Sequence, residues 1–183
     1  SAVGPTDVPV PKTLGLCADD SVNQAPFYVM DFVDGIVLDS PEKGAELSIE
    51  QREAVAFDLV DVLADLHAID NNAVGLGDLA RREGYVERQV KRWTRQWADS
   101  RTRDLPEIDE VAYLLAASIP QQHSVSIAHG DYRLGNCLTN LDSNRVAAVL
   151  DWELCTLGDP LADLGYLGVY WADPEGNGQR SND

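Results

Sequence analysis

The sequence has few of the residues that crosslink small secreted proteins or bind structural metals. It has only three histidines and three cysteines among 183 residues, the latter at Cys17, Cys137 and Cys155. The cysteines are odd in number and lack the CxxC or Cys/His spacing of zinc ligands, which excludes a disulfide framework and a zinc site. This cysteine usage is typical of a reducing compartment, so we expect a cytoplasmic protein.

Long apolar runs and an excess of basic residues are also missing. No run reaches the length of a membrane span, and the first residues lack the basic and apolar layout of a signal peptide. The 14 Lys and Arg face 31 Asp and Glu, a net charge of −17. Such a chain repels phosphate backbones, so neither a nucleic acid nor a membrane is an expected partner.

The most informative residues are an acid, an amide and a second acid. Asp131 ends a His-Gly-Asp triplet, Asn136 follows, and Asp151 begins an Asp-Trp-Glu triplet. This set suits transfer of a phosphoryl group from a magnesium nucleotide to a hydroxyl: one carboxylate accepts the hydroxyl proton, while the amide and second carboxylate hold the metal. Either triplet alone is a weak motif, and an Asp before a strand is often only a cap; their order and spacing favour a functional site.

A β-hairpin is expected to bring these side chains together. Its predicted strands are residues 136–139 and 145–150, joined by a turn at residues 140–144. The hairpin places Asn136 and Asp151 at its open end, beside Asp131. Three oxygen-bearing groups then converge, as a magnesium site requires.

These segments resemble a known family. The pattern His-Gly-Asp131-x-x-x-x-Asn136, followed by Leu-Asp151-Trp-Glu, is similar to the catalytic and metal-binding segments of the aminoglycoside phosphotransferase (APH) family, relatives of protein and choline kinases. The run LDWELCTLGDPLADLGY at residues 150–166 resembles the branch whose kinase-like domains occur alone in bacteria or fused to acyl-CoA dehydrogenases. The resemblance implies an α+β, protein-kinase-like fold, with a mostly helical C-terminal lobe and the remnant of a small β N-terminal lobe.

The resemblance also implies roles for single residues. Asp131 would be the catalytic base, Asn136 and Asp151 the magnesium ligands, and His129 a brace for the catalytic loop. Arg133, two residues past the base, matches the cation that protein kinases place near the γ-phosphate. The implied cofactors are ATP and Mg²⁺.

The apolar, β-prone run at residues 26–35 has two interpretations. By itself it predicts a core strand. Ahead of a kinase-like loop it resembles the hinge strand between two lobes. The resemblance implies that the adenine pairs with the carbonyl of Asp31 and the amide of Val33, with Met30 behind it.

Helix signals surround these motifs. Residues 48–69 form an amphipathic helix that Ser48 and Gln51 can cap as a capping box, and His67 near its end is assigned to structure rather than catalysis. Residues 108–119 predict another helix.

A third helix is predicted after the metal motif. Pro160 opens it and Asp159 is its cap. Asp163 is either an exposed helix residue or, as the family resemblance suggests, a hydrogen-bond partner of the catalytic loop.

Residues 81–103 are basic, with eight basic and three acidic residues, whereas the rest of the chain has 6 basic and 28 acidic residues. At helical spacing, one face carries the apolar side chains Val86, Val90, Trp93 and Trp97, and the other carries Arg88, Arg92 and Arg95. The segment is either a solvated basic face over a core stripe or a helix that presents Arg to an anionic substrate such as an acyl-CoA.

Parts of a complete kinase are missing before the hinge. The 25 residues ahead of position 26 contain one lysine, Lys12, and no glycine-rich turn precedes it. We therefore expect an internal fragment with little activity alone. Residues 1–33 would be the N-lobe remnant and hinge, and residues 34–183 an incomplete C-terminal lobe that ends in a flexible polar tail at residues 173–183.

The sequence thus predicts a small-molecule kinase. The parent protein would move the γ-phosphate of ATP to a hydroxyl of a small molecule, which is a hydroxyacyl-CoA, an aminoglycoside-like acceptor, a choline-like alcohol or a sugar. An alternative is a non-catalytic nucleotide-binding or interaction module of kinase fold. A hydrolase is less favoured, because the sequence has no nucleophile elbow and no metal-binding His pair.

Overall fold

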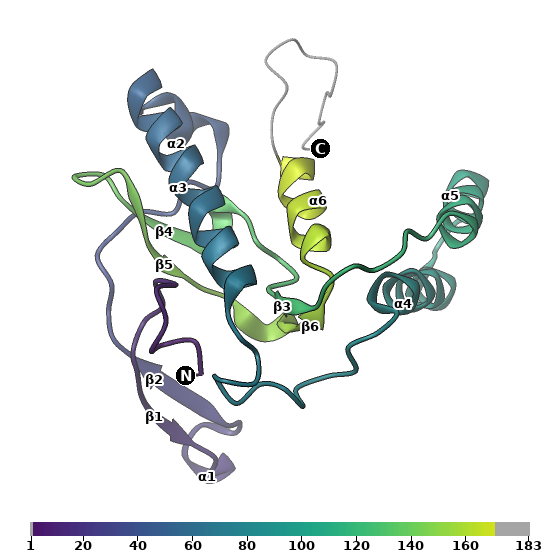
Figure 1. Cartoon of the computed structure of the whole chain (residues 1–183), viewed down its shortest axis with the longest axis horizontal. Coiled ribbons are helices and arrows are strands. Elements are labelled where there is room, and N and C mark those ends of the chain that lie inside the picture. The colour runs from purple at the N-terminus through teal and green to yellow at the C-terminus, as the bar shows by residue number, and fades with distance from the viewer. Residues whose placement is uncertain (1, 171–183) are drawn as a thin grey trace.

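The computed structural model describes residues 2–170, and the predicted tail lies outside this range. In chain order the elements are β1 (Thr13–Cys17), α1 (Asp20–Asn23), β2 (Phe27–Met30), α2 (Pro41–Ala45), α3 (Ile49–Ala68), α4 (Tyr85–Ser100), α5 (Pro106–Ala117), β3 (Ser126–Ala128), a 3-10 turn (Leu134–Asn136), β4 (Cys137–Asn140), β5 (Arg145–Val149), a second 3-10 turn (Trp152–Leu154), β6 (Thr156–Gly158) and α6 (Pro160–Tyr170). Figure 1 shows their arrangement.

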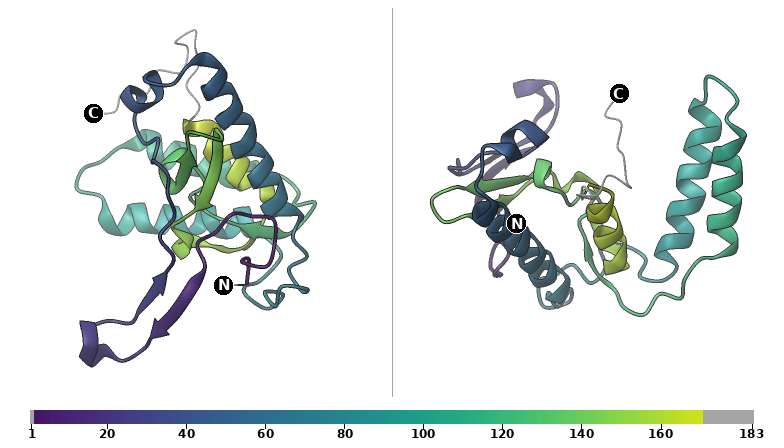
Figure 2. Two further views of the ribbon diagram at one scale, coloured as in Figure 1. Left: turned by 90° about the vertical axis from the view of Figure 1, so that its left-hand side faces the viewer. Right: turned by 90° about the horizontal axis from the view of Figure 1, so that it is seen from above.

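Strands β1 and β2 form an antiparallel hairpin that extends away from the rest of the chain (Figures 1 and 2). Its side chains are largely exposed: Leu16 by 74% and Tyr28 by 61%. The run at residues 26–35 is therefore not a buried core strand, and that interpretation is wrong for the described chain. Its regular strand ends at Met30, after which the amide of Asp31 still donates to the Lys12 carbonyl (2.9 Å).

Helix α3 forms as its sequence predicts. The Ser48 hydroxyl accepts from the Gln51 amide (3.2 Å), and the Gln51 side chain accepts from the Ser48 amide (3.0 Å), so the capping box is complete. Its buried face consists of Val55, Asp58, Leu59, Val62, Leu63 and Leu66. This face packs against β3 and β5, which brings the helix directly over the hairpin that carries the candidate site.

The predicted hairpin is present as the antiparallel pair β4–β5, with Cys137 opposite Val149. The first strand begins one residue later than predicted, because Asn136 belongs to the 3-10 turn. Two outer segments hold the hairpin: Ile36 pairs with Thr139 on one side, and the Val149 amide donates to Pro9 on the other. The chain that leaves β2 is thus hydrogen-bonded directly to the hairpin.

Helices α4 and α5 lie side by side and apart from the α3 and α6 region (Figure 2). Neither begins where its segment of the sequence analysis begins, at residues 81 and 108. Helix α4 begins only after Gly84, whose φ of 64° is left-handed and so suits glycine. Helix α5 begins two residues earlier than predicted, at Pro106, because proline suits the first turn of a helix.

The core lies under α3. Its fully buried side chains include Leu59, Leu66, Ile127, Tyr132 and Leu157. The Tyr132 hydroxyl donates to the Leu59 carbonyl (2.7 Å), which ties the catalytic-loop segment to α3.

All three cysteines are free thiols, and burial raises the pKa of Cys137 to about 12. Within residues 2–170, no helix has the length and apolar character needed to cross a membrane.

Candidate functional site

Asp131 lies at the centre of a small polar network. Its carboxylate accepts from the Asn136 side chain (2.6 Å) and contacts the Arg133 guanidinium (3.3 Å). Tyr166 of α6 lies near enough to this carboxylate to favour its ionised form. Burial raises the pKa of Asp131, but Tyr166, the bond from Asn136 and the Arg133 cation outweigh it, so the pKa lies below its ordinary value. The carboxylate is therefore ionised and able to accept a proton.

His129 is fully buried behind this carboxylate. Its Nε2 bonds to the Leu150 carbonyl (2.9 Å), and its Nδ1 accepts from the Asp131 amide (3.3 Å). A carbonyl only accepts, so the ring hydrogen is on Nε2 and the ring is neutral. Burial lowers the pKa of His129, which favours the same neutral form. The ring thus joins the loop at Asp131 to the end of β5.

Asp163 on α6 binds the backbone of the loop that precedes Asp131. Its two oxygens accept from the backbone amides of His129 and Gly130 (2.8 Å each), and it also pairs with His67 (3.0 Å). The carboxylate is 99% buried. The predicted hydrogen bonding between Asp163 and the loop at His129 and Gly130 is confirmed, and His67 contacts the same carboxylate.

The backbone of Asn136 is bonded to Leu150, the residue that precedes Asp151. The Leu150 amide donates to the Asn136 carbonyl (2.8 Å), so Asp151 follows directly after the residue that pairs with Asn136. The Asn136 side-chain nitrogen is used by Asp131, which leaves its oxygen Oδ1 as the atom for a cation. Asp151 is exposed and has a left-handed backbone (φ 62°, ψ 58°), unusual for a residue other than glycine.

These two residues fit magnesium by their chemistry. Amide and carboxylate oxygens are hard donors, and Mg²⁺ is commonly bound by one or two such groups together with substrate phosphates. No cluster of three or more His, Cys, Asp or Glu able to hold a metal occurs in residues 2–170.

The hinge residues lie where the β1–β2 hairpin joins the rest of the chain. Met30 ends β2 and is 42% exposed. Over residues 2–170, no hydrogen bond uses the Asp31 carbonyl or the Val33 amide. The backbone groups expected to pair with adenine are thus available to do so. The segment that follows them pairs at Ile36 with Thr139 of the β4–β5 hairpin.

Tyr166 and Tyr170 are members of the network that we did not identify in the sequence. Their hydroxyls are 3.1 Å apart, and the Tyr170 ring lies 5.4 Å from the Arg133 guanidinium. The signal was present, because Asp163, Tyr166 and Tyr170 have the i, i+3, i+7 spacing of one helix face. That face turns toward the catalytic loop.

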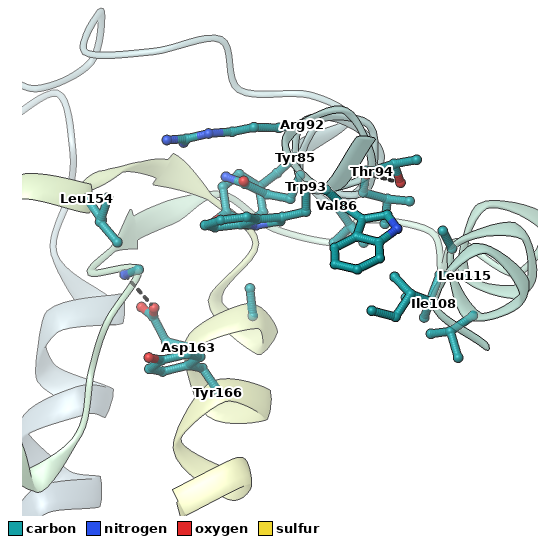
Figure 3. A pocket seen from close by; sticks show the side chains of 17 residues that line it. Tyr85, Val86, Arg92, Trp93, Thr94, Ile108, Leu115, Leu154, Asp163 and Tyr166 are labelled. Carbon is teal, nitrogen blue, oxygen red and sulfur yellow. Dashed lines mark hydrogen bonds between the residues drawn. The ribbon is translucent and has the colours of Figure 1, made fainter. Parts of the chain in front are cut away.

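A groove of about 460 Å³ opens between the catalytic loop and the α4–α5 pair (Figure 3). Its far wall is apolar and aromatic, with Trp93, Trp97, Ile108 and Leu115 among its residues. Its near wall includes Gly130, Asp163 and Tyr166. The groove thus reaches the residues that surround Asp131.

A second hollow of about 560 Å³ lies on α4 and is basic, lined by Arg88, Lys91, Arg92, Arg95, Gln96, Asp99 and Ser100. The predicted division of the helix into an apolar and a basic face is confirmed. Arg92 lies between the two hollows, with its guanidinium 5.5 Å from the Trp93 ring centre.

The β1–β2 hairpin is attached to a mostly helical lobe. In that lobe the loop at His129–Arg133 is followed by the β4–β5 hairpin. This arrangement defines an α+β protein of the kinase-like class. The chain belongs to the phosphotransferase enzyme (APH) family, whose family model matches residues 1–182. The predicted family and fold class are confirmed.

Relatives agree with this assignment. Acyl-CoA dehydrogenase family member 10 of Mus musculus is 38% identical over 166 residues, covering 90% of this chain but 15% of its own length. A solved Ralstonia eutropha JMP134 structure, classed with the aminoglycoside phosphotransferases, is 40% identical with a TM-score of 0.84. It matches 99% of this chain, which spans 56% of it. The complex of APH(2″)-IIIa with GDP and kanamycin shares the fold (TM-score 0.69, 18% identity, 90% of this chain and 56% of that one).

Proposed function

We propose that this chain carries the catalytic centre of an ATP-dependent phosphotransferase that acts on a hydroxyl of a small molecule. The main support is the 2.6 Å contact between Asp131 and Asn136, at the open end of the hairpin that leads to Asp151. An acid, an amide and a second acid are then available for one magnesium nucleotide. The three free thiols favour a cytoplasmic location.

In this proposal Asp131 is the general base. It takes the proton of the acceptor hydroxyl as the hydroxyl oxygen bonds to the γ-phosphorus. The bond from that phosphorus to the bridging oxygen breaks, and ADP leaves with the electron pair. Arg133, with a third of its side chain exposed, turns its outer donors to the transferred group, while His129 and Asp163 hold the loop.

Asn136 and Asp151 are proposed to hold Mg²⁺, which neutralises charge on the phosphates when it is bound. The adenine is proposed to pair with the Asp31 carbonyl and the Val33 amide, in front of Met30. The neighbouring structure of the same fold that contains GDP supports a nucleotide as the donor.

The acceptor is either a hydroxyacyl-CoA or an aminoglycoside-like molecule. The groove favours the first, because Trp93 and Trp97 offer an apolar wall to an acyl chain and the α4 arginines offer cations to phosphates. The kanamycin complex of a protein with this fold, and the net charge of −17, favour the second.

The test is phosphoryl transfer from MgATP by the whole protein that carries this chain, with β-hydroxybutyryl-CoA and kanamycin as acceptors. The substitution Asp131→Asn keeps the shape of the side chain but removes the carboxylate that acts as the base. We therefore expect kcat to fall by about 10² to 10⁴, with little change in ATP binding. Asp142→Asn, at the opposite end of the same hairpin and exposed, should leave kcat unchanged.

Two outcomes contradict the proposal. If the Asp131→Asn variant keeps the wild-type kcat, then Asp131 is not the base. If the wild type binds MgATP but transfers phosphate neither to these acceptors nor to water, the alternative of a non-catalytic nucleotide-binding module is correct instead.

A further inference from the structure

The α4–α5 pair is joined to the rest of the chain by two linkers, residues 69–84 before α4 and residues 118–125 after α5 (Figure 1). The pair carries the far wall of the groove, whereas the near wall belongs to the loop at Gly130 and to α6. The width of the groove therefore depends on how the two linkers are held against the rest of the chain.

Gln122 of the second linker bonds to the first linker and to the start of α4 through one side chain. Its oxygen Oε1 accepts from the Tyr85 amide (3.2 Å), and its nitrogen Nε2 donates to the carbonyls of Arg82 and Ser124 (2.9 Å each). A primary amide has two hydrogens, and both are used here. In the flipped orientation the side-chain nitrogen would face the Tyr85 N–H, so these three bonds define the orientation of the side chain.

The bond to the Tyr85 amide takes the place of an ordinary helix cap. Tyr85 is the first residue of α4, and the first amides of a helix have no partner within it. Gly84 precedes it and has no side chain that could accept from these amides. Gln122 therefore caps α4 from the linker beyond α5, so one side chain holds the two ends of the helical pair together.

Tyr85 connects this attachment to the catalytic loop. Tyr85 is buried, and its ring lies so close to Gly158 of β6 that a Cβ at this glycine would come within 2.8 Å of the ring. Strand β6 pairs with β3, which ends directly before His129. Tyr85 also lines the groove (Figure 3). Gln122 thus holds the residue at which α4 packs on the strand pair next to the catalytic loop.

We propose that Gln122 is a positioning residue for the acceptor: it holds the α4–α5 pair at the distance from the catalytic loop that a complete acceptor groove requires. This inference rests on the proposed function. Gln122 is not one of the described residues that line the groove, so it acts through Tyr85 and α4 rather than by touching the acceptor.

The expected effect is on the acceptor and not on ATP. When the α4–α5 pair is held less firmly, only a fraction of the molecules has a complete groove, and the apparent affinity for the acceptor falls by that fraction. The residues proposed to bind the nucleotide and the cation are not among the described residues that line the groove. The affinity for MgATP therefore stays the same.

The test is steady-state phosphoryl transfer by the whole protein, with MgATP and either β-hydroxybutyryl-CoA or kanamycin, whichever the wild type phosphorylates. Gln122→Ala removes all three bonds. We expect the KM for the acceptor to rise about tenfold, the size of one to two ordinary hydrogen bonds, while the KM for ATP and the kcat at saturating acceptor stay within about twofold. Gln122→Glu keeps the size of the side chain but turns an oxygen toward the Arg82 and Ser124 carbonyls, so it should raise the acceptor KM at least as far.

A matched control and a second measurement separate positioning from general damage to the fold. Gln121→Ala changes the exposed neighbour of Gln122 in the same linker and should alter neither KM. Hydrogen exchange followed by mass spectrometry should show faster exchange in the first turn of α4 for Gln122→Ala, with unchanged exchange in the β4–β5 hairpin.

The inference is overturned if both Gln122 variants keep the acceptor KM of the wild type. It is also overturned if they weaken ATP and acceptor binding alike, because Gln122 would then support the whole fold rather than the groove. In both cases the wild type still transfers phosphate, so the proposed function stands. A wild type that transfers phosphate to neither acceptor overturns this inference, and the proposed function is overturned with it if water accepts no phosphate either.

Discussion

At the residue scale, Asp163 links three parts of the molecule through one carboxylate. It accepts hydrogen bonds from the backbone amides of His129 and Gly130, and it pairs with His67 on α3. Because it is almost fully buried, every one of these bonds is shielded from water. The position of Asp131 therefore depends on a residue of α6.

Replacing Asp163→Asn should destabilise the protein by about 2 kcal/mol. The amide has one acceptor oxygen instead of two, so at least one buried donor of the loop loses its partner. Chemical denaturation of the wild type and the variant measures the difference. Asp61→Asn, on the exposed face of α3, is the control and should change stability little. Equal stabilities for Asp163→Asn and the wild type would show that the loop does not depend on this carboxylate.

The spacing of polar residues along the sequence predicted the candidate site. Asp131, Asn136 and Asp151 were identifiable because a turn-forming segment separates two short apolar runs. Tyr166 was harder to identify, since a helical tyrosine usually belongs to a core and only the fold shows what it faces. The interaction with Asp131 is a tertiary contact, which no local pattern encodes.

At the element scale, helix α3 is fastened to the hairpin that carries the candidate site. Asp58 in the buried face of α3 accepts from the Arg145 side chain (2.8 Å) and the Val146 amide (2.6 Å). Apolar side chains of the same face pack against β5. The helix thus holds β5 at its first two residues, Arg145 and Val146, and the strand then leads toward Asp151.

Replacing Asp58→Ala should lower the free energy of unfolding by about 2–4 kcal/mol. The change leaves the buried Val146 amide without its partner and removes the attachment of the helix to β5. The measurement is denaturant-induced unfolding, with Asp65→Ala as the control because Asp65 is exposed on the same helix. If both variants lose the same amount of stability, the link between α3 and β5 is not important.

Element prediction was best where local signals are strong. The capping box and apolar spacing of α3 specify its ends, and α6 begins at the proline and capping Asp that the sequence shows. The basic segment at residues 81–103 did not give the bounds of α4, because charge composition, unlike a cap, does not mark where a helix begins. The hairpin at β1–β2 was ambiguous, since an apolar run does not reveal whether another part of a protein covers it.

At the scale of the whole molecule, we propose two parts with different tasks. Residues 2–33 hold the β1–β2 hairpin and the hinge, and residues 34–170 hold the described part of a kinase-like C-terminal lobe. Exposed apolar side chains on the hairpin, such as Leu16 and Phe32, are of the kind that a larger β lobe would cover. The nucleotide would bind between the hinge and the Asp131 network.

We propose that Asn136 and Asp151 hold one divalent cation together with the nucleotide, next to the base Asp131. Binding of Mn²⁺, which can replace Mg²⁺, is measured by electron paramagnetic resonance with and without a non-hydrolysable ATP analogue, in the whole protein that carries this chain. We predict a cation site that forms with the nucleotide and is weakened at least about tenfold by Asp151→Asn. Asp142→Asn, at the other end of the hairpin, should bind as the wild type does. Unchanged Mn²⁺ binding in Asp151→Asn would contradict the account.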